Sequence, residues 1–287
     1  MIEALAAPPR SPWRDAGVRL LRNRAAIVSC VVLAMIAAAC ALVPSFAQWP
    51  LDAVDWSAIQ APPSAEHWFG TDGNGRDLFV RIFYGGRISL TLGLAATLVA
   101  VIIGVAWGAT AGYAGGAVDG LMMRAVDVLY ALPFMFFVIL LMVFFGRDMV
   151  LMFIALGAVS WLDMARIVRG QTLTLKRREF VRAAHAMGAR PTAVVVRHIV
   201  PNLLGPVAVF ATLTVPRVIL FESLLSFLGL GVQEPMTSWG VLISEGASAM
   251  ESAPWMLLFP AVFLATTLFA LNFIGDGLRD ALDPRDH

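Results

Sequence analysis

Long stretches without a charged side chain alternate along the chain with short segments that hold most of the charges. The charge-free stretches are 25–51, 88–118, 128–146, 149–162, 198–216 and 252–275. A membrane-spanning helix needs about 20 mostly apolar residues. Five of these stretches hold one such helix each. The short stretch from 149 becomes a sixth if it extends to Val168, because Arg166 near a helix end can place its guanidinium at the membrane interface.

This pattern predicts an all-α fold, a polytopic membrane protein with six transmembrane helices at 25–46, 88–112, 125–146, 148–168, 203–228 and 255–275. The first helix is too long an apolar stretch for a signal peptide, so we expect it to stay in the membrane. The other five form a core over 88–275. This core includes the long loops 169–200 and 229–254, and the segments outside the helices and the core are 1–24, 47–87 and 276–287.

Composition supports the membrane assignment. Of the 287 residues, 59% are hydrophobic and 14% are charged, and the mean hydropathy is +0.77. Soluble domains are about 45–50% apolar and roughly 25% charged, so an ordinary soluble protein is excluded. The net charge of +1 offers no bulk positive charge to recruit nucleic acid.

The basic residues predict the orientation. Sixteen of the 21 Lys and Arg residues lie in the terminal segments and in the loops that follow the second and fourth helices. Basic residues concentrate on the cytoplasmic side of a membrane, so this bias places both termini and the 169–200 loop in the cytoplasm. The segments 47–87 and 229–254 then lie outside. We expect a multi-pass protein of the cell inner (plasma) membrane.

The cytoplasmic loop 169–200 is too long to be structureless in a compact protein, so we expect it to fold or dock. Good helix formers from Thr172 to Met187 are followed by a helix stop at Gly188, and a second short helix starts near Pro191. Ala183, Ala184 and Ala186 form a low-profile surface that another backbone could approach closely. A plug for a partner's cleft is one interpretation. A helix pair lying on anionic lipid is the alternative.

Six motifs together resemble a known family. They are Gly70–Asp77, Ser160–Arg166, Glu179–Ala184 with Gly188, His198–Asn202, Leu225–Gly231 and Gly275–Pro284. Over about residues 20–287 the chain resembles the C-type permease subunit of the dipeptide/oligopeptide/nickel ABC importers. The stretches 134–176 and 220–284 look most like the oligopeptide permease subunit. The resemblance implies the type I ABC importer permease fold.

The resemblance also implies a set of partners. These are a second, B-type permease subunit, two ATPase subunits and an external substrate-binding protein docking on 47–87 and 229–254. The family loop enters a cleft of the ATPase, and its residues here are Glu179, Arg182, Ala183, Ala184, Gly188, His198 and Pro201. Arg182 stands where the family motif has Glu, which reverses a charge at that contact.

No residue pattern points to catalysis by the chain itself. It lacks the G-x-x-x-x-G-K-[ST] phosphate loop, and its one lysine, Lys176, has no Gly-rich context. We expect a non-catalytic subunit with no cofactor of its own, and ATP and Mg²⁺ on the partner ATPases. The implied activity is oligopeptide import by alternating access. Dipeptides, nickel, glutathione and antimicrobial peptides are alternative cargoes within the same group.

Arg217 and Glu222 are the ionisable residues deepest in a predicted helix. A charge at the bilayer centre costs at least about 2.5–3.5 kcal/mol, so both should face protein or water. We expect them to line the translocation path, where they would contact peptide termini, act as a gate or bridge to the other permease. The alternative is a structural ion pair with that subunit.

The sequence also suggests two ion pairs within helices and one loop that resembles a calcium site. Asp163 with Arg166, and Arg124 with Asp127, are three residues apart and could form structural ion pairs on one helix face. The segment Asp72–Asp77 resembles a calcium loop, but Arg76 occupies a ligand position, so we expect a turn there and no metal.

Two other classes of membrane protein fit the sequence less well than a permease does. An intramembrane serine protease is suggested by Gly246-Ala247-Ser248-Ala249, but this motif lies in an outside loop and no His lies in a helix core to act as general base. A secondary transporter should show paired inverted repeats with interrupted helices, and none is evident.

Overall fold

The computed structural model describes residues 17–146 and 149–282, and this part of the chain is built from helices with only isolated β-bridges. The helices are α2 (Arg24–Phe46), α3 (Leu78–Ala114), α4 (Gly116–Ala131), α5 (Phe134–Phe145), α6 (Met149–Leu175), α7 (Glu179–Ala186), α8 (Pro191–Val194), the π-helical turn η1 (Val195–Ile199), α9 (Val200–Phe227), α10 (Trp239–Ser248) and α11 (Trp255–Leu282). The all-α prediction is confirmed.

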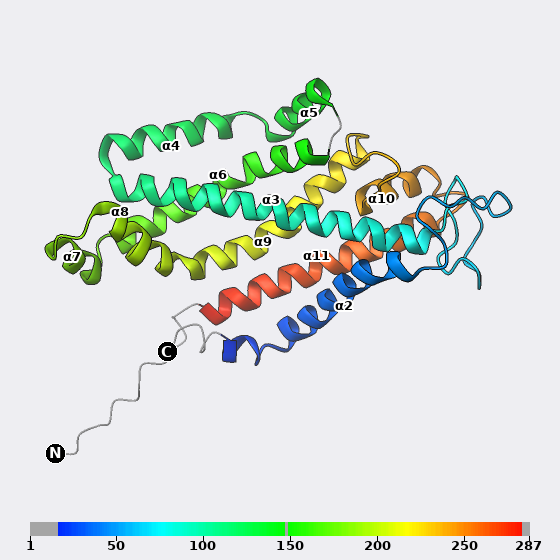
Figure 1. Ribbon diagram of the computed structural model, residues 1–287, viewed down its shortest axis with the longest axis horizontal. Helices are drawn as coiled ribbons and strands as arrows, with labels where there is room; N and C mark the ends of the chain where they lie inside the picture. Colours follow the sequence, from blue (N-terminus) through cyan, green and yellow to red (C-terminus); the bar gives the residue numbers. More distant parts are fainter. Residues whose placement is uncertain (1–16, 147–148, 283–287) are drawn as a thin grey trace, which may run out of the picture.

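The long helices α2, α3, α6, α9 and α11 run side by side along the molecule (Figure 1). Each is long and apolar enough to cross a membrane, with α9 continuing α8 and η1 as one segment from Pro191 to Phe227. The short helices lie at the ends of this bundle. Helix α7 is at one end, and α10 with the segment 47–77 is at the other (Figure 1).

The third predicted helix, 125–146, is not continuous. Its place is taken by α4 and α5, which are bent by 79° relative to one another at a short break. The cause is Pro133: a proline has no N–H to donate and disfavours helical geometry in the residue before it, and Leu132 is extended with φ −73° and ψ 128°. The prediction of one straight helix here is wrong. The described residues hold six spans if α4 and α5 count as one.

Helix α3 begins ten residues before the predicted start at 88. Asp77 caps it, since its Oδ1 accepts a hydrogen bond from the Val80 amide at 2.9 Å. Arg81 belongs to the predicted segment 47–87, but it lies inside the helix and is buried. Charge alone therefore placed the helix boundary too late.

The single helix expected over 172–187 is two helices. Helix α6 ends at Leu175, Arg178 has an extended backbone, and α7 starts at Glu179. The turn lets α7 bury Val181 and Ala184 against the core that contains Ile199 and Leu203. The helix stop at Gly188, which has φ +80°, and the helix start at Pro191 are as predicted.

Helices α3 and α6 cross closely because glycines line their contact. Gly104, Gly108 and Gly112 lie four residues apart on one face of α3. A Cβ added to Gly104 would lie 2.5 Å from the Met164 Cβ, and one added to Gly112 would lie 2.9 Å from the Arg169 carbonyl oxygen. Such small-residue faces allow membrane helices to approach backbone to backbone. The crossing fixes the position of α6, whose other face carries Asp163.

Candidate functional site

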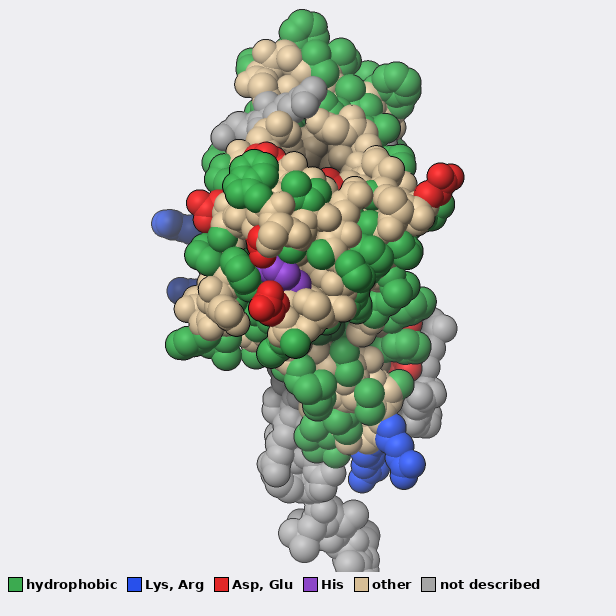
Figure 2. Space-filling view, turned by 90° about the vertical axis from the view of Figure 1, so that its right-hand side faces the viewer, with side chains coloured by type: hydrophobic (Ala, Val, Ile, Leu, Met, Phe, Trp, Pro, Cys, Tyr) green, Lys and Arg blue, Asp and Glu red, His purple; other side chains and the backbone are tan. Residues whose placement is uncertain are grey.

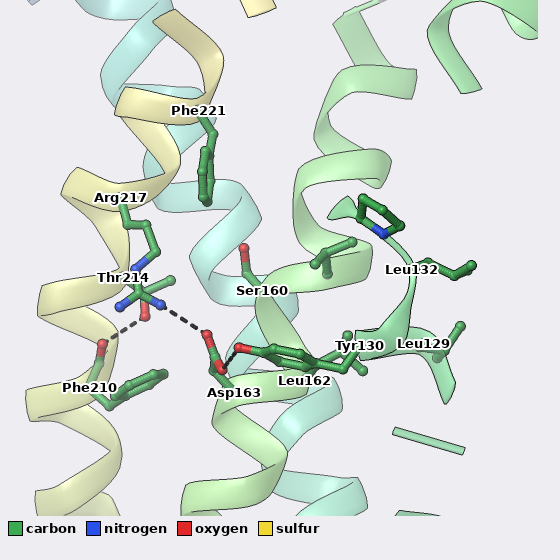
Figure 3. Close-up of a pocket in the computed structure, with 12 residues that line it drawn as sticks. Leu129, Tyr130, Leu132, Ser160, Leu162, Asp163, Phe210, Thr214, Arg217 and Phe221 are labelled. Carbon is green, nitrogen blue, oxygen red and sulfur yellow. Dashed lines mark hydrogen bonds and ion pairs between the residues drawn. The ribbon is translucent and has the colours of Figure 1, made fainter. Parts of the chain in front are cut away.

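A cavity of ≈ 360 Å³ lies between the α4–α5 break, α6 and α9 (Figure 3). Most of its wall is apolar or aromatic, with Leu129, Leu132, Leu162, Phe210 and Phe221. Its volume is at the lower end of the range for ligand pockets, about 300–1,000 Å³. The bend at Pro133 forms one side of the cavity, so the broken helix that the sequence did not predict shapes the site.

Arg217 and Asp163 form an ion pair on the wall of this cavity (Figure 3). Arg217 Nη1 lies 2.9 Å from Asp163 Oδ2, and the Tyr130 hydroxyl donates a hydrogen bond of 2.7 Å to Asp163 Oδ1. Both charges are accessible: the side chains of Arg217 and Asp163 are 54% and 30% exposed. A charge exposed midway along membrane helices needs water or protein beside it, because lipid would penalise it strongly.

A second ion pair adjoins the first. Arg166 Nη2 lies 2.7 Å from Asp127 Oδ1, and its guanidinium stacks over the Tyr130 ring at 4.2 Å from the centroid. The predicted pairs Asp163–Arg166 and Arg124–Asp127 are therefore wrong. Asp163 and Arg166 point to partners on other helices, which a spacing rule within one helix cannot detect. Within the described residues, Arg124 forms no ion pair.

Glu222 lies apart from Arg217. Its carboxylate is fully buried and accepts hydrogen bonds from three hydroxyls, at 2.6 Å from Ser238 Oγ, 2.7 Å from Ser226 Oγ and 3.3 Å from Ser89 Oγ. These serines come from α3, α9 and the cap of α10. The structure thus places Arg217 on the cavity and Glu222 in the core, and the expectation that they line one surface together does not hold here.

A second charged network ties the segment 47–77 to the bundle. The Asp72 carboxylate accepts from Arg76 Nε at 2.7 Å and also from Arg81, which reaches Glu245 on α10 at 2.9 Å. His67 Nδ1 lies 2.8 Å from Asp77 Oδ2. Figure 2 looks onto this end, where acidic side chains gather around the centre. The Asp72–Asp77 turn is held by arginines, and the described residues contain no cluster fit for a metal.

The residues predicted to contact an ATPase lie at the opposite end. Glu179, Arg182, Ala183, Gly188 and Pro201 are exposed, and His198 is half-buried. Ala184 differs, since it is only 2% exposed and packs inward. The low-profile surface is therefore narrower than predicted and consists of Ala183 and Ala186.

Helix α7 is also tied to the end of α3, which sequence reasoning missed. The Tyr113 hydroxyl and His185 Nε2 are hydrogen-bonded at 3.0 Å, and their rings stack with an interplanar angle of 10°. Lys176 donates a hydrogen bond to the Tyr113 carbonyl oxygen. A displacement of α7 would therefore act directly on α3.

Comparisons with known proteins show which family this chain resembles. Residues 100–285 match the family described as binding-protein-dependent transport system inner membrane component, and residues 11–63 match the N-terminal TM domain of oligopeptide transport permease C. The chain is 58% identical to the oligopeptide transport system permease protein OppC of Escherichia coli, over 99% of this chain and 95% of that protein. It is 44% identical to OppC of Bacillus subtilis, over 99% and 93%.

A dipeptide transport system permease protein, DppC of Bacillus subtilis, is 43% identical over 99% of this chain and 89% of its own length. Among solved structures, an inward-facing MetNI methionine ABC transporter chain superposes with a TM-score of 0.58 at 18% identity. The superposition covers 72% of this chain and 96% of that one. This likeness establishes a shared fold.

Proposed function

This chain belongs to the family of binding-protein-dependent transport system inner membrane components, and we propose that it is a permease subunit of an ATP-driven oligopeptide importer. The observation that carries the proposal is the 58% identity to an oligopeptide permease across 99% of this chain. Dipeptides are the second candidate cargo, because a dipeptide permease is still 43% identical.

The importer would contain three kinds of partner, four chains in all. A second permease subunit would complete the membrane pathway, two ATPase subunits would bind ATP and Mg²⁺, and an external binding protein would deliver the peptide. This chain would hold no cofactor. The two ends of the bundle fit two different partners, since α7 presents Ala183 at one end and α10 lies at the other (Figure 1).

The proposed orientation follows the basic residues. Both termini and α7 would lie in the cytoplasm, and the segment 47–77 with α10 would face the outside compartment, in an inner membrane. The segment 169–200 holds six Arg residues and the one lysine of the chain. Glu234, Glu245 and Glu251, in contrast, belong to the loop 229–254, which has no Lys or Arg. The ATPases would then bind α7, and the binding protein would bind near Glu234.

Alternating access is the mechanism these parts support. Closure of the ATPase dimer would move α7, and the contacts of Tyr113 with His185 and Lys176 would carry that movement to α3. Helix α3 packs on α6 and α9, so the cavity that holds Arg217 would change shape with it. Cycling between two arrangements of packed helices is how small movements at one site become large ones at another.

Substrate-stimulated ATP hydrolysis tests the cargo. The complete importer, reconstituted in liposomes with its binding protein, would be given penta-alanine, di-alanine, glutathione or Ni²⁺ at equal concentration. We expect penta-alanine to stimulate hydrolysis most. Stimulation by di-alanine, glutathione or Ni²⁺ without any response to penta-alanine would contradict the proposed cargo. An importer assembled without this chain serves as the control and should not respond.

A further inference from the structure

Arg217 makes incomplete use of its hydrogen-bonding groups. A guanidinium has five N–H donors in a planar fork, and Nη1 alone binds Asp163. Within the described residues, Nη2 and Nε have no partner, and the side chain is more than half exposed on the cavity wall. The edge formed by Nε and Nη2 has the geometry that binds a carboxylate through two parallel hydrogen bonds.

Asp163, in contrast, has a partner at each of its two carboxylate oxygens. One of its oxygens accepts from Arg217 and the other accepts from Tyr130, as Figure 3 shows. Its negative charge neutralises Arg217 when the cavity is empty. Asp163 and Tyr130 therefore hold the guanidinium at Nη1 and leave Nε and Nη2 available to a ligand.

We propose that Arg217 binds the carboxylate at the C-terminus of a peptide passing through the cavity, with Asp163 and Tyr130 as positioning residues. The inference rests on the proposed function and assigns a substrate group to one of its residues. The ligand class is a carboxylate attached to an apolar or aromatic side chain, since Phe210, Phe221 and Leu132 form the adjoining wall.

The volume of the cavity matches one end of a peptide chain and not a whole oligopeptide. A water molecule takes about 30 Å³ of liquid volume, so ≈ 360 Å³ holds roughly a dozen waters, or one to two residues of a peptide. A whole oligopeptide would extend beyond it. The terminal carboxylate is common to all peptides with a free C-terminus, so a site that reads it accepts many sequences.

Binding at this site should be weak and reversible. Asp163 competes with the peptide for the same guanidinium, and exposed ion pairs exchange readily with water. Weak binding suits a transport pathway, because a tightly held peptide would not leave on the other side. Because Asp163 pairs with Arg217 when no peptide is bound, the charge of Arg217 is balanced in the empty cavity as well.

Import of matched peptides tests the inference. Proteoliposomes with the complete importer would be given tri-alanine with a free carboxylate or tri-alanine amide, which lacks it. The binding protein is identical in every assay, so its own preference cancels when variants are compared. We expect Arg217→Gln to lower the ratio of acid to amide import about tenfold, the effect of losing a charge-assisted hydrogen bond.

Arg169→Gln is the matched control, because Arg169 also forms a partly exposed ion pair, with Asp119, but neither lines the cavity nor contacts Tyr130. Its ratio of acid to amide import should equal that of the wild type. If Arg217→Gln prevents assembly, Arg217→Lys keeps the charge without the fork and should give an intermediate ratio.

The outcomes separate the two claims. Equal loss of acid and amide import in the Arg217 variants would overturn the carboxylate site, since a structural ion pair affects both peptides alike. Failure of the wild-type importer to take up either peptide, with intact assembly and ATP hydrolysis, would overturn the proposed oligopeptide function itself.

Discussion

Ser238 Oγ lies 2.6 Å from Glu222 Oε1, and this hydrogen bond joins the cap of α10 to the C-terminal part of the neighbouring helix α9. Ser238 also accepts from the Val241 amide and so starts α10. The Ser238 side chain therefore both caps α10 and attaches this helix to the bundle. Glu222 is the acceptor that makes the attachment specific.

Glu222→Ala should destabilise the protein strongly. It leaves buried serine hydroxyls without an acceptor and opens a cavity, and such losses cost about 2–5 kcal/mol. Glu222→Gln keeps the size and one acceptor oxygen, so we expect a smaller loss. The melting temperature of the purified chain in detergent measures both. Equal melting temperatures for the wild type and Glu222→Ala would contradict a stabilising role for the cluster.

Gly108→Ala should weaken the crossing of α3 and α6. The added methyl would overlap the Ala165 carbonyl oxygen, and overpacking of this kind costs roughly 1–3 kcal/mol. Gly120→Ala is the control, because Gly120 is a helical glycine with open space around it. That variant should melt at or above the wild-type temperature, since Ala favours a helix over Gly by up to about 1 kcal/mol. If both variants lowered stability equally, close approach at Gly108 would not be the reason.

Ala183→Trp should uncouple ATP hydrolysis from transport. Ala183 is an exposed small residue on α7, and an indole there would block the close approach of an ATPase surface. Ala184 is unsuitable for this test because it packs inside the protein. Ala106→Trp, an exposed substitution on α3, controls for added bulk. We expect peptide-stimulated hydrolysis to fall several-fold in Ala183→Trp and to persist in Ala106→Trp. Full coupling in Ala183→Trp would remove α7 from the docking surface.

The segment 47–77 should lose stability in acid. Hydrogen bonds from the Ser57 side chain and backbone lower the pKa of the Asp55 carboxyl below its ordinary value of 3.8. A carboxyl with a lowered folded-state pKa stabilises the protein above its unfolded pKa and loses that contribution as pH falls through the folded value. The melting temperature of the wild type should therefore exceed that of Asp55→Asn at neutral pH.

The difference between the two melting temperatures should shrink as the pH drops below about 4. The comparison isolates Asp55 because every other carboxyl is present in both proteins. A difference that stays constant across this range, or that widens in acid, would show that the Asp55 charge does not stabilise the segment.

The hydrophobic pattern located most of the long helices because each is a local property of about 20 successive residues. Two boundaries failed for identifiable reasons. Arg81 looked like a loop residue, yet it is buried in α3 by partners at Asp72 and Glu245. Arg178 lies at a turn with no Gly or Pro to mark it, and the turn forms because α7 buries Val181.

The site was predictable only in part. The position of Arg217 within an apolar helix signalled a functional or structural role, and the structure places it on a cavity. Its partner Asp163 could not be identified, because the contact joins residues on different helices. The bend between α4 and α5 had a signal in Pro133, since a proline inside an apolar stretch ends or kinks a helix.

Peptide accumulation against a gradient tests the central claim most directly. Proteoliposomes holding the complete importer would receive labelled penta-alanine together with the binding protein on one face and ATP on the other. An ATP-driven oligopeptide permease predicts an internal peptide concentration above the external one, and no accumulation when ATP or this chain is left out. Accumulation without ATP, or none with every component present, would contradict the account.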